Sequence, residues 1–271
     1  MNTPPPAPLA FVADGRRLVA AVPGARWLDR IVVWTPGDPD ELVTGDVETA
    51  VIVLAGTFDL VANGTAWPAR GARREQFAGR PMAVYLPPHT TFRVSKGSGR
   101  LLLVSARQPA AGQAPTGREA LAKKPLLPLA GSGKAFDPTS GEWRPAETFP
   151  TAPESLPPRR FARLPVGGCT LERVFAADYK AATLCLDEVV LPAGVTLPLG
   201  EVPDRPPGDE VLLFVHSEGE AVVGTGTRVT RSHGPGAFRL SPEQFAGLAV
   251  RAIDQRAYVA IGYAGKPASG S

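Results

Sequence analysis

The sequence has few of the residues from which metal centres, disulfide frameworks and stacking platforms are built. Only 3 His, 2 Cys and 4 Trp occur among its 271 residues. The two cysteines, Cys169 and Cys185, have no CxxC spacing and are too few for a disulfide framework, so we expect two reduced, buried thiols. The scattered tryptophans and a net charge of +3, spread without a basic block, do not favour nucleic-acid binding.

The sequence also lacks the long apolar run of a membrane span and the pattern of an export signal. No segment approaches the roughly 18 apolar residues that a helix needs to cross a bilayer. Residues 1–24 have no basic region followed by an unbroken apolar run, so they do not resemble a signal peptide. We therefore predict a cytoplasmic protein that binds no membrane. Its length is sufficient to bury a core without disulfides or metal.

What the sequence does have is 30 Pro and 29 Gly, and these separate many short apolar runs. Short β-branched runs bounded by turn residues are typical of strands in all-β proteins. The predicted strands of the first half are 30–35, 49–62, 81–87, 91–95 and 100–106. Those of the second half are 169–175, 181–192, 210–217, 219–224, 236–241, 247–253 and 256–265.

The two halves repeat the same order of strands and turns. Residues 53–71 and 214–234 each contain a strand, a glycine turn, a strand and a second turn, and a Pro-bearing segment follows each. This pattern predicts an all-β fold of two jelly-roll (cupin) barrels in tandem, because a single larger sandwich does not explain the repeat. We expect an N-terminal barrel at 1–106, a linker with extended and short helical segments at 107–160, and a C-terminal barrel at 161–271.

Three segments resemble one enzyme family. The run "GARREQFAGRPMAVYLPPHTTFRV" (71–94) is similar to the signature of the 5-deoxy-glucuronate isomerases of inositol catabolism, and "ETAVIVLAGTFDL" (48–60) and "AYVAIGYAG" (257–265) resemble further strands of that family. The resemblance implies a bicupin whose active site and divalent metal lie in the C-terminal barrel. It also implies an aldose–ketose isomerisation of a uronic-acid-like substrate.

The metal ligands of that family are not in place here. The family carries a His-x-His in a loop, a Glu on the following strand and a further His in the last hairpin. The corresponding loop of this chain, 198–210, has no His, and Gln244 and Phe245 stand where the last ligand is expected. Only Glu210 matches, so a zinc or manganese ion is the family expectation but we predict a degenerate site with no metal and no other cofactor.

The candidate catalytic residues are Glu210 and His216. Because side chains alternate along a strand, these two share one face, and the match of Glu210 to the cupin Glu predicts that this face points into the barrel. Glu210 would act as the base and His216 as its partner, or the two would form hydrogen bonds in a core. On the preceding loop, Asp204 and Glu201 are the candidates for binding substrate, with a solvated acidic loop or a carboxylate metal site as the alternatives.

Other polar residues carry weaker indications. His89 and His233 lie at turns and are expected to be exposed. Arg73 and Arg74 suit an anionic sugar acid but are interpreted as solvated surface residues. The N-terminal barrel has no ligand set, with Phe92 near the place of a cupin's last His, and is predicted to be a metal-free scaffold or a dimerisation module.

Two classes of function remain open on the sequence. The first is a sugar-acid aldose–ketose isomerase with a degenerate metal site. The second is a catalytically silent bicupin that binds a small molecule or acts structurally or in regulation, because a fold alone does not determine function. The expected partner is a small-molecule ligand such as a sugar acid, and a homodimer is left open.

Overall fold

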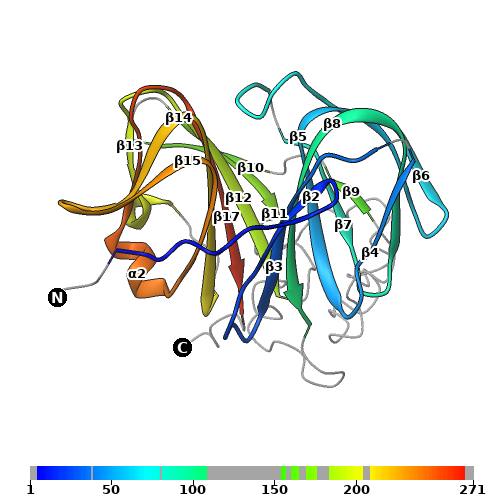
Figure 1. Ribbon diagram of the computed structural model, residues 1–271, viewed down its shortest axis with the longest axis horizontal. Coiled ribbons are helices and arrows are strands. Elements are labelled where there is room, and N and C mark those ends of the chain that lie inside the picture. Colours follow the sequence, from blue (N-terminus) through cyan, green and yellow to red (C-terminus); the bar gives the residue numbers. More distant parts are fainter. Residues whose placement is uncertain are drawn as a thin grey trace, which may run out of the picture.

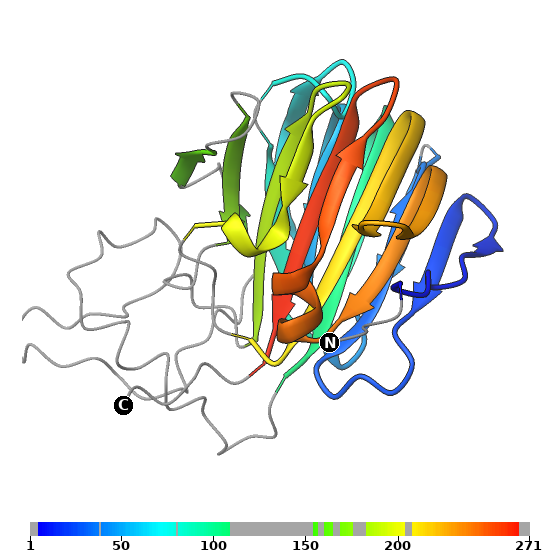
Figure 2. The ribbon, with the colours of Figure 1, turned by 90° about the vertical axis from the view of Figure 1, so that its left-hand side faces the viewer.

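The computed structural model describes residues 5–37, 39–79, 81–108, 154–156, 160–164, 169–175, 183–203 and 208–265. The regular secondary structure of this part of the chain is almost all β, arranged as two curled antiparallel sheets that lie side by side (Figures 1 and 2). The exceptions are the 3-10 turn η2 (Leu199–Glu201) and the short helix α2 (Pro242–Gly247). None of the described helices is long and apolar enough to cross a membrane.

The first sheet is built from the N-terminal half. Its strands are β1 (Val12–Asp14), β2 (Arg17–Ala21), β3 (Leu28–Trp34), β4 (Asp40–Val43), β5 (Val47–Ala62), β6 (Thr65–Arg73), β7 (Ala83–Leu86), β8 (Thr91–Arg107) and β9 (Glu154–Leu156). Their order is β1-β2-β3-β8-β5-β7-β9, with β4 paired to β8 and β6 paired to β5. Asn63 and Gly64 join β5 to β6 with positive φ angles of 44° and 82°, as a tight hairpin turn requires.

The second sheet repeats this arrangement. Its strands are β10 (Arg160–Arg163), β11 (Thr170–Phe175), β12 (Leu184–Leu191), β13 (Thr196–Pro198), β14 (Glu210–Thr225), β15 (Arg228–Leu240), β16 (Ala249–Ala252) and β17 (Ala257–Ala264). Their order is β10-β11-β12-β17-β14-β16-β13, with β15 paired to β14. The sequence β3-β8-β5-β7 of the first sheet therefore corresponds to β12-β17-β14-β16 of the second. The all-β prediction with two curled jelly-roll sheets is confirmed.

Three apolar clusters hold these sheets together. The first interior, inside the N-terminal sheet, contains residues of that sheet alone, including Trp34 and Phe92. The second interior, inside the C-terminal sheet, contains residues of that half alone, including Phe238 and Phe245. The interface core contains side chains from both sheets, so the two sheets pack face to face.

An N-terminal arm of the chain crosses from one sheet to the other (Figure 1). The Leu9 N–H donates to the Ala237 carbonyl at 2.7 Å, and the Thr230 hydroxyl donates to the Pro6 carbonyl at 2.7 Å. The chain then enters β1 of the first sheet. Residues 6–9 therefore lie against β15, although the strands that follow belong to the opposite half.

Two features of the connections differ from the sequence prediction or lie beyond the described residues. The predicted linker at 107–160 falls mostly outside the described residues, including its short helical segment, and its described part at 154–156 forms β9 on the first sheet. Helix α2 was not predicted. Its signal is present in the sequence, because Ser241 and Gln244 form a capping box with Pro242 at the first helical position.

Candidate functional site

The face of strand β14 that carries the candidate catalytic residues points to the other sheet and not, as predicted, into the barrel. Glu210, Leu212, Phe214 and His216 share a face as expected, but Leu212 and Phe214 lie in the interface core. The alternate residues fill the second interior, namely Val211, Leu213 and Val215. The predicted inward direction is wrong because both faces of this strand are apolar. Alternation identifies which residues share a face but not which face points inward.

The carboxylate of Glu210 binds the backbone of the other sheet. Its Oε2 accepts hydrogen bonds from the N–H groups of Trp27 at 3.0 Å and Leu28 at 2.8 Å. Its Oε1 accepts from the Arg26 N–H at 2.6 Å and from Arg239 Nη2 at 3.2 Å. Glu210 is buried, and both oxygens have partners. This geometry fits a docking residue between the two sheets.

A second buried glutamate docks the sheets from the other side. Glu48 Oε1 accepts hydrogen bonds from the backbone N–H groups of Thr183 at 2.7 Å and Leu184 at 2.8 Å, where β12 begins. The Thr183 hydroxyl also donates to it at 2.8 Å, and the Tyr85 hydroxyl donates to Oε2 at 2.9 Å. Glu48 near the start of β5 and Glu210 at the start of β14 therefore both carry interface contacts.

His216 lies at the same interface and is far from Glu210. They are six positions apart on one continuous strand, which is about 20 Å at roughly 3.3 Å per residue. The His216 ring is half-buried, with its centroid 6.5 Å from that of Phe77. Burial, and then the charge of Arg100, lowers the pKa of His216 to about 4, so the ring is neutral at neutral pH. The structure does not bring Glu210 and His216 together, and their pairing as base and partner stays a prediction.

The family-like segment 71–94 also contacts the second sheet. Arg73 is buried and forms a bidentate ion pair with Glu188 of β12, which also accepts a hydrogen bond from the Tyr258 hydroxyl at 2.9 Å. Arg256 of the second sheet pairs with Glu75 at 3.0 Å and stacks over the Phe77 ring at 4.8 Å. The interpretation of Arg73 as a solvated residue is therefore wrong, because its partner lies 115 residues away in the sequence.

The two predicted substrate-binding residues lie in or beside a partly described loop. Glu201 ends η2 and is exposed. Asp204 lies outside the described residues. The role of both in binding substrate stays a prediction.

The residues at the expected metal positions do not fit a divalent cation. Val202 and Phe245 are buried in the second interior and have no donor atom. Gln244 Oε1 accepts the Ser241 N–H at 2.9 Å in the capping box, and Glu210 points to the other sheet. No cluster of three or more His, Cys, Asp or Glu side chains occurs among the described residues.

The second interior nevertheless contains one carboxyl group. Asp187 lies on β12 between Cys185 and Val189, and both of these neighbours on its face belong to the second interior. It is fully buried, and neither of its carboxyl oxygens accepts a hydrogen bond. The charged side chain of Arg173 lies on the adjacent β11, with its Nε 3.9 Å from Asp187 Oδ1. We call Asp187 and Arg173 the interior pair.

The environment of Asp187 changes its acidity. Burial raises the pKa of its carboxyl to about 7, and the Arg173 charge opposes this shift. Arg173 also donates from Nη2 to the Pro203 carbonyl. Sequence reasoning missed this group, although a signal was present. An acidic residue within the apolar run "LCLDEVVL" is unusual, because charged residues are rarely buried without partners.

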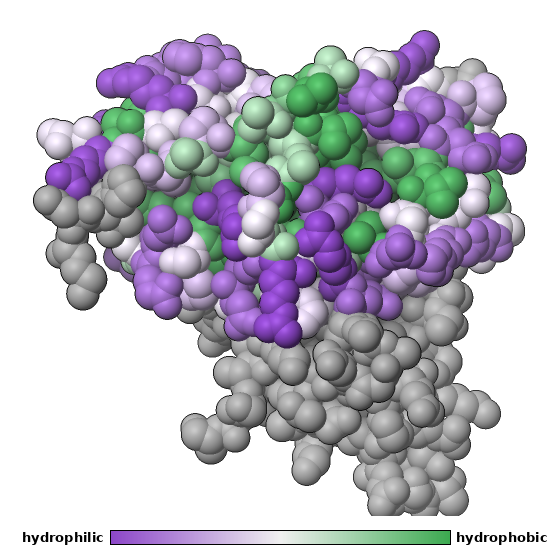
Figure 3. All heavy atoms as spheres, turned by 60° about the horizontal axis from the view of Figure 1, so that its bottom comes forward, coloured by the Kyte–Doolittle hydropathy of each residue, from purple (hydrophilic) through white to green (hydrophobic). Residues whose placement is uncertain are grey.

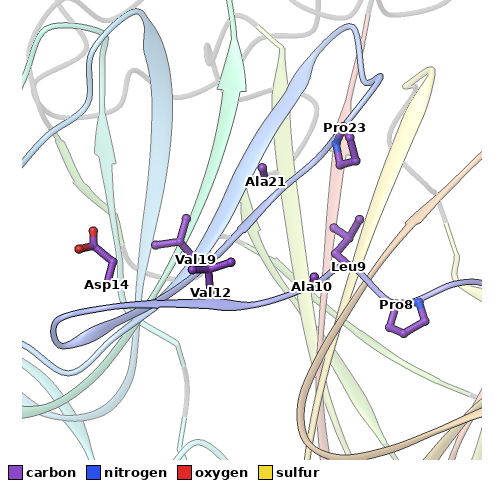
Figure 4. Close-up of a pocket in the computed structure, with 8 residues that line it drawn as sticks. All are labelled: Pro8, Leu9, Ala10, Val12, Asp14, Val19, Ala21 and Pro23. Carbon is purple, nitrogen blue, oxygen red and sulfur yellow. The ribbon is translucent and has the colours of Figure 1, made fainter.

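An apolar pocket lies elsewhere, between the N-terminal arm and the first sheet (Figure 4). Its lining residues are Pro8, Leu9, Ala10, Val12, Asp14, Val19, Ala21 and Pro23. Asp14 is the one ionisable side chain among them. On the face of the molecule shown in Figure 3, hydrophobic residues reach the surface near the middle among hydrophilic ones. The pocket offers too few polar groups for a site that binds a sugar acid.

Comparison with known proteins supports the resemblance seen in the sequence. Residues 27–124 match the model of the KduI/IolB family, so the predicted similarity to 5-deoxy-glucuronate isomerases is confirmed. This match does not include the residues of the second interior. A search of curated proteins found no significant match.

Two solved structures share the fold along most of the chain. An IolB-like protein from Salmonella typhimurium LT2 is 15% identical, with 97% of this chain and 95% of that chain covered and a TM-score of 0.60. The oxalate decarboxylase of Lactobacillus farciminis, as a formate complex, is 12% identical, with coverages of 96% and 85% and a TM-score of 0.51. At these identities the likeness shows the fold alone.

Proposed function

We propose that this chain, with its KduI/IolB-type N-terminal half, is a sugar-acid isomerase-like protein that takes its ligand in the second interior without a metal. The observation that carries the proposal is the family match over residues 27–124. The fold similarity to an IolB-like protein over 97% of the chain supports the same architecture. A place in inositol catabolism, a cytoplasmic location and a homodimeric state belong to the same proposal.

An aldose–ketose isomerisation moves a proton between two adjacent carbons. It requires a base for the C–H proton and a positive group for the developing oxyanion. A metal supplies the positive group in many such enzymes, and the described residues at the expected metal positions, Val202 and Phe245, do not fit one. Turnover is therefore expected to be absent or much lower than in a metal-dependent isomerase.

The role of Glu210 in this proposal is docking. Four donors already bind its two oxygens, and the amides of Arg26, Trp27 and Leu28 fix it against the first sheet. Removing the Glu210 carboxylate would weaken the contact between the sheets. A loss of ligand binding in a Glu210→Gln variant would then result from a displaced sheet. Such a displacement also lowers the free energy of unfolding, whereas the loss of a ligand contact alone does not.

A catalytically silent binding protein is the second candidate. It is favoured by the apolar residues at the expected metal positions, Val202 and Phe245, which are both buried. In this case the second interior binds a small molecule and no reaction follows. The two candidates share the site and differ only in turnover.

The discriminating experiment is an isomerase assay on 5-deoxy-glucuronate with and without added Zn²⁺ or Mn²⁺. It is run beside thermal unfolding with the same compound. We expect stabilisation by the compound and little or no metal-dependent turnover. Robust turnover that requires added metal would overturn the metal-free site. No stabilisation and no turnover would exclude both candidate functions for this compound.

A further inference from the structure

The four buried acidic side chains among the described residues fall into two groups. Glu48, Glu188 and Glu210 lie at the interface of the two sheets, and each accepts hydrogen bonds from identified donors. Asp187 lies alone in the second interior, and neither of its oxygens accepts a hydrogen bond. The buried carboxylates at the interface of the two sheets therefore accept hydrogen bonds, whereas the buried carboxyl group in the second interior accepts none.

A buried carboxyl group that accepts no hydrogen bond destabilises the folded chain, so its presence needs an explanation. Burying a polar group without a hydrogen bond costs about 1–3 kcal/mol, and more if the group is charged. The Nε of Arg173 is 3.9 Å from Asp187 Oδ1, which is too long for a hydrogen bond. Arg173 therefore brings a positive charge close to Asp187 but donates no hydrogen bond to its carboxyl group.

Strand geometry fixes where this carboxyl points. Asp187 lies opposite Arg173 on one side and opposite Ile261 of β17 on the other. Ile261 belongs to the second interior, whereas Leu184 and Leu186 of the same strand belong to the interface core. The Asp187 carboxyl is thus held on the inner face of the barrel, at the middle of a strand that is paired on both sides.

We propose that Asp187 is the ligand-contacting carboxylate of the second interior, where it accepts hydrogen bonds from hydroxyl groups of a sugar acid while Arg173 attracts the acid's negative charge. The choice of a sugar acid rests on the proposed function, and the contact with Asp187 rests on the geometry of the interior pair. An ionised carboxylate only accepts hydrogen bonds, and the hydroxyl groups of a sugar acid would supply the donors that Asp187 lacks in the second interior. A guanidinium is the side chain best suited to an anionic carboxylate.

The acidity of Asp187 is compatible with this role. Its pKa near 7 allows the carboxyl to hold or release a proton at neutral pH. That is the range in which a group bound to a ligand transfers protons most effectively. The same residue therefore serves a binding protein and a slow isomerase.

The test measures binding of D-glucuronate and of D-glucose by calorimetry and by thermal unfolding at about pH 7. The variants are Asp187→Asn, Asp187→Leu and Arg173→Gln, and the matched control is Asp46→Asn, whose side chain is 95% exposed. We expect the wild type and the control to bind D-glucuronate, and both Asp187 variants to bind at least about tenfold more weakly. Arg173→Gln should lose the preference for D-glucuronate over D-glucose. Circular dichroism establishes that each variant is folded.

The outcomes separate this inference from the proposed function. Unchanged affinity for D-glucuronate in folded Asp187→Asn would overturn the inference and leave the proposed function standing. Binding of D-glucose but not D-glucuronate, lost in both Asp187 variants, would overturn the sugar-acid function and support the contact. A wild-type protein that binds neither compound would contradict both.

Discussion

Glu48 and Glu210 occupy equivalent positions in the two sheets, and each binds backbone amides of the opposite sheet. Glu48 lies opposite Ala106 of β8, and Glu210 lies opposite Ala264 of the corresponding strand β17. Glu48 binds the beginning of β12, and Glu210 binds the beginning of the equivalent strand β3. The repeated strand order therefore includes a reciprocal pair of contacts, and the Glu that resembles a metal ligand in the sequence belongs to that pair.

This reciprocity predicts a large and similar loss of stability when either carboxylate is removed. Glu210→Ala and Glu48→Ala each leave buried backbone N–H groups without an acceptor, which should lower the free energy of unfolding by about 2–4 kcal/mol. Urea denaturation measures the change. The exposed Glu201 provides the control, since Glu201→Ala should change stability by less than about 0.5 kcal/mol. A loss below 1 kcal/mol in both glutamate variants would show that the contacts contribute little.

The Arg73–Glu188 pair predicts strong coupling between its two residues. Both side chains are 3% exposed, so removing one partner leaves a buried charge without the opposite charge of its ion pair. Glu188→Leu and Arg73→Met should each cost about 3–5 kcal/mol, and the double variant should recover much of this loss. A double-mutant cycle of unfolding free energies gives the coupling. Additive effects of the two substitutions would contradict the ion pair.

The interior pair predicts a contribution of Asp187 to the pH dependence of stability. Burial raises the pKa of Asp187 from its ordinary value of 3.8 to about 7 in the folded chain. Between these values the folded chain binds the proton more tightly than the unfolded chain. The contribution of Asp187 to stability is therefore present below about pH 4 and is lost as the pH rises through about 7.

Replacement of Asp187 with Asn should remove this contribution. The variant should be more stable than the wild type above about pH 7, by about 1–3 kcal/mol, because no buried charge then forms. Urea denaturation at a series of pH values measures the difference, with Asp46→Asn as the control. A parallel change in the stability of the wild type and of Asp187→Asn across this pH range would contradict the raised pKa of Asp187.

His216 predicts a pH effect of the opposite sign. Burial and the charge of Arg100 lower its pKa from the ordinary value of 6.5 to about 4, so the folded chain resists protonation of this ring. The stability that neutral His216 contributes is present above about pH 6.5 and is lost as the pH falls toward 4. His216→Gln should flatten this acid limb in the same denaturation series. His233→Gln, in a residue that is exposed on β15, should not.

Much of the fold was predictable from the sequence because its signals are local. Short β-branched runs between Gly and Pro indicate the strands, and the repeat of their order predicts two similar sheets. The direction of β14 was not predictable, since Val211 and Leu212 are both apolar and each suits either environment. Arg73 and Asp187 were also missed. The role of Arg73 depends on Glu188, which is distant in the sequence. The role of Asp187 depends on the absence of a hydrogen-bond donor near its carboxyl group.

The N-terminal arm makes the second sheet depend on a segment of the first half of the chain. Residues 6–9 bind β15, so a C-terminal half produced alone would lack a segment that the N-terminal half provides. Each half would also expose its side of the interface core to water. Two separately expressed polypeptides, divided within 109–153, should therefore associate into a complementing heterodimer that co-purifies. Deletion of residues 1–10 from the first polypeptide should weaken that association, because it removes the contacts with β15.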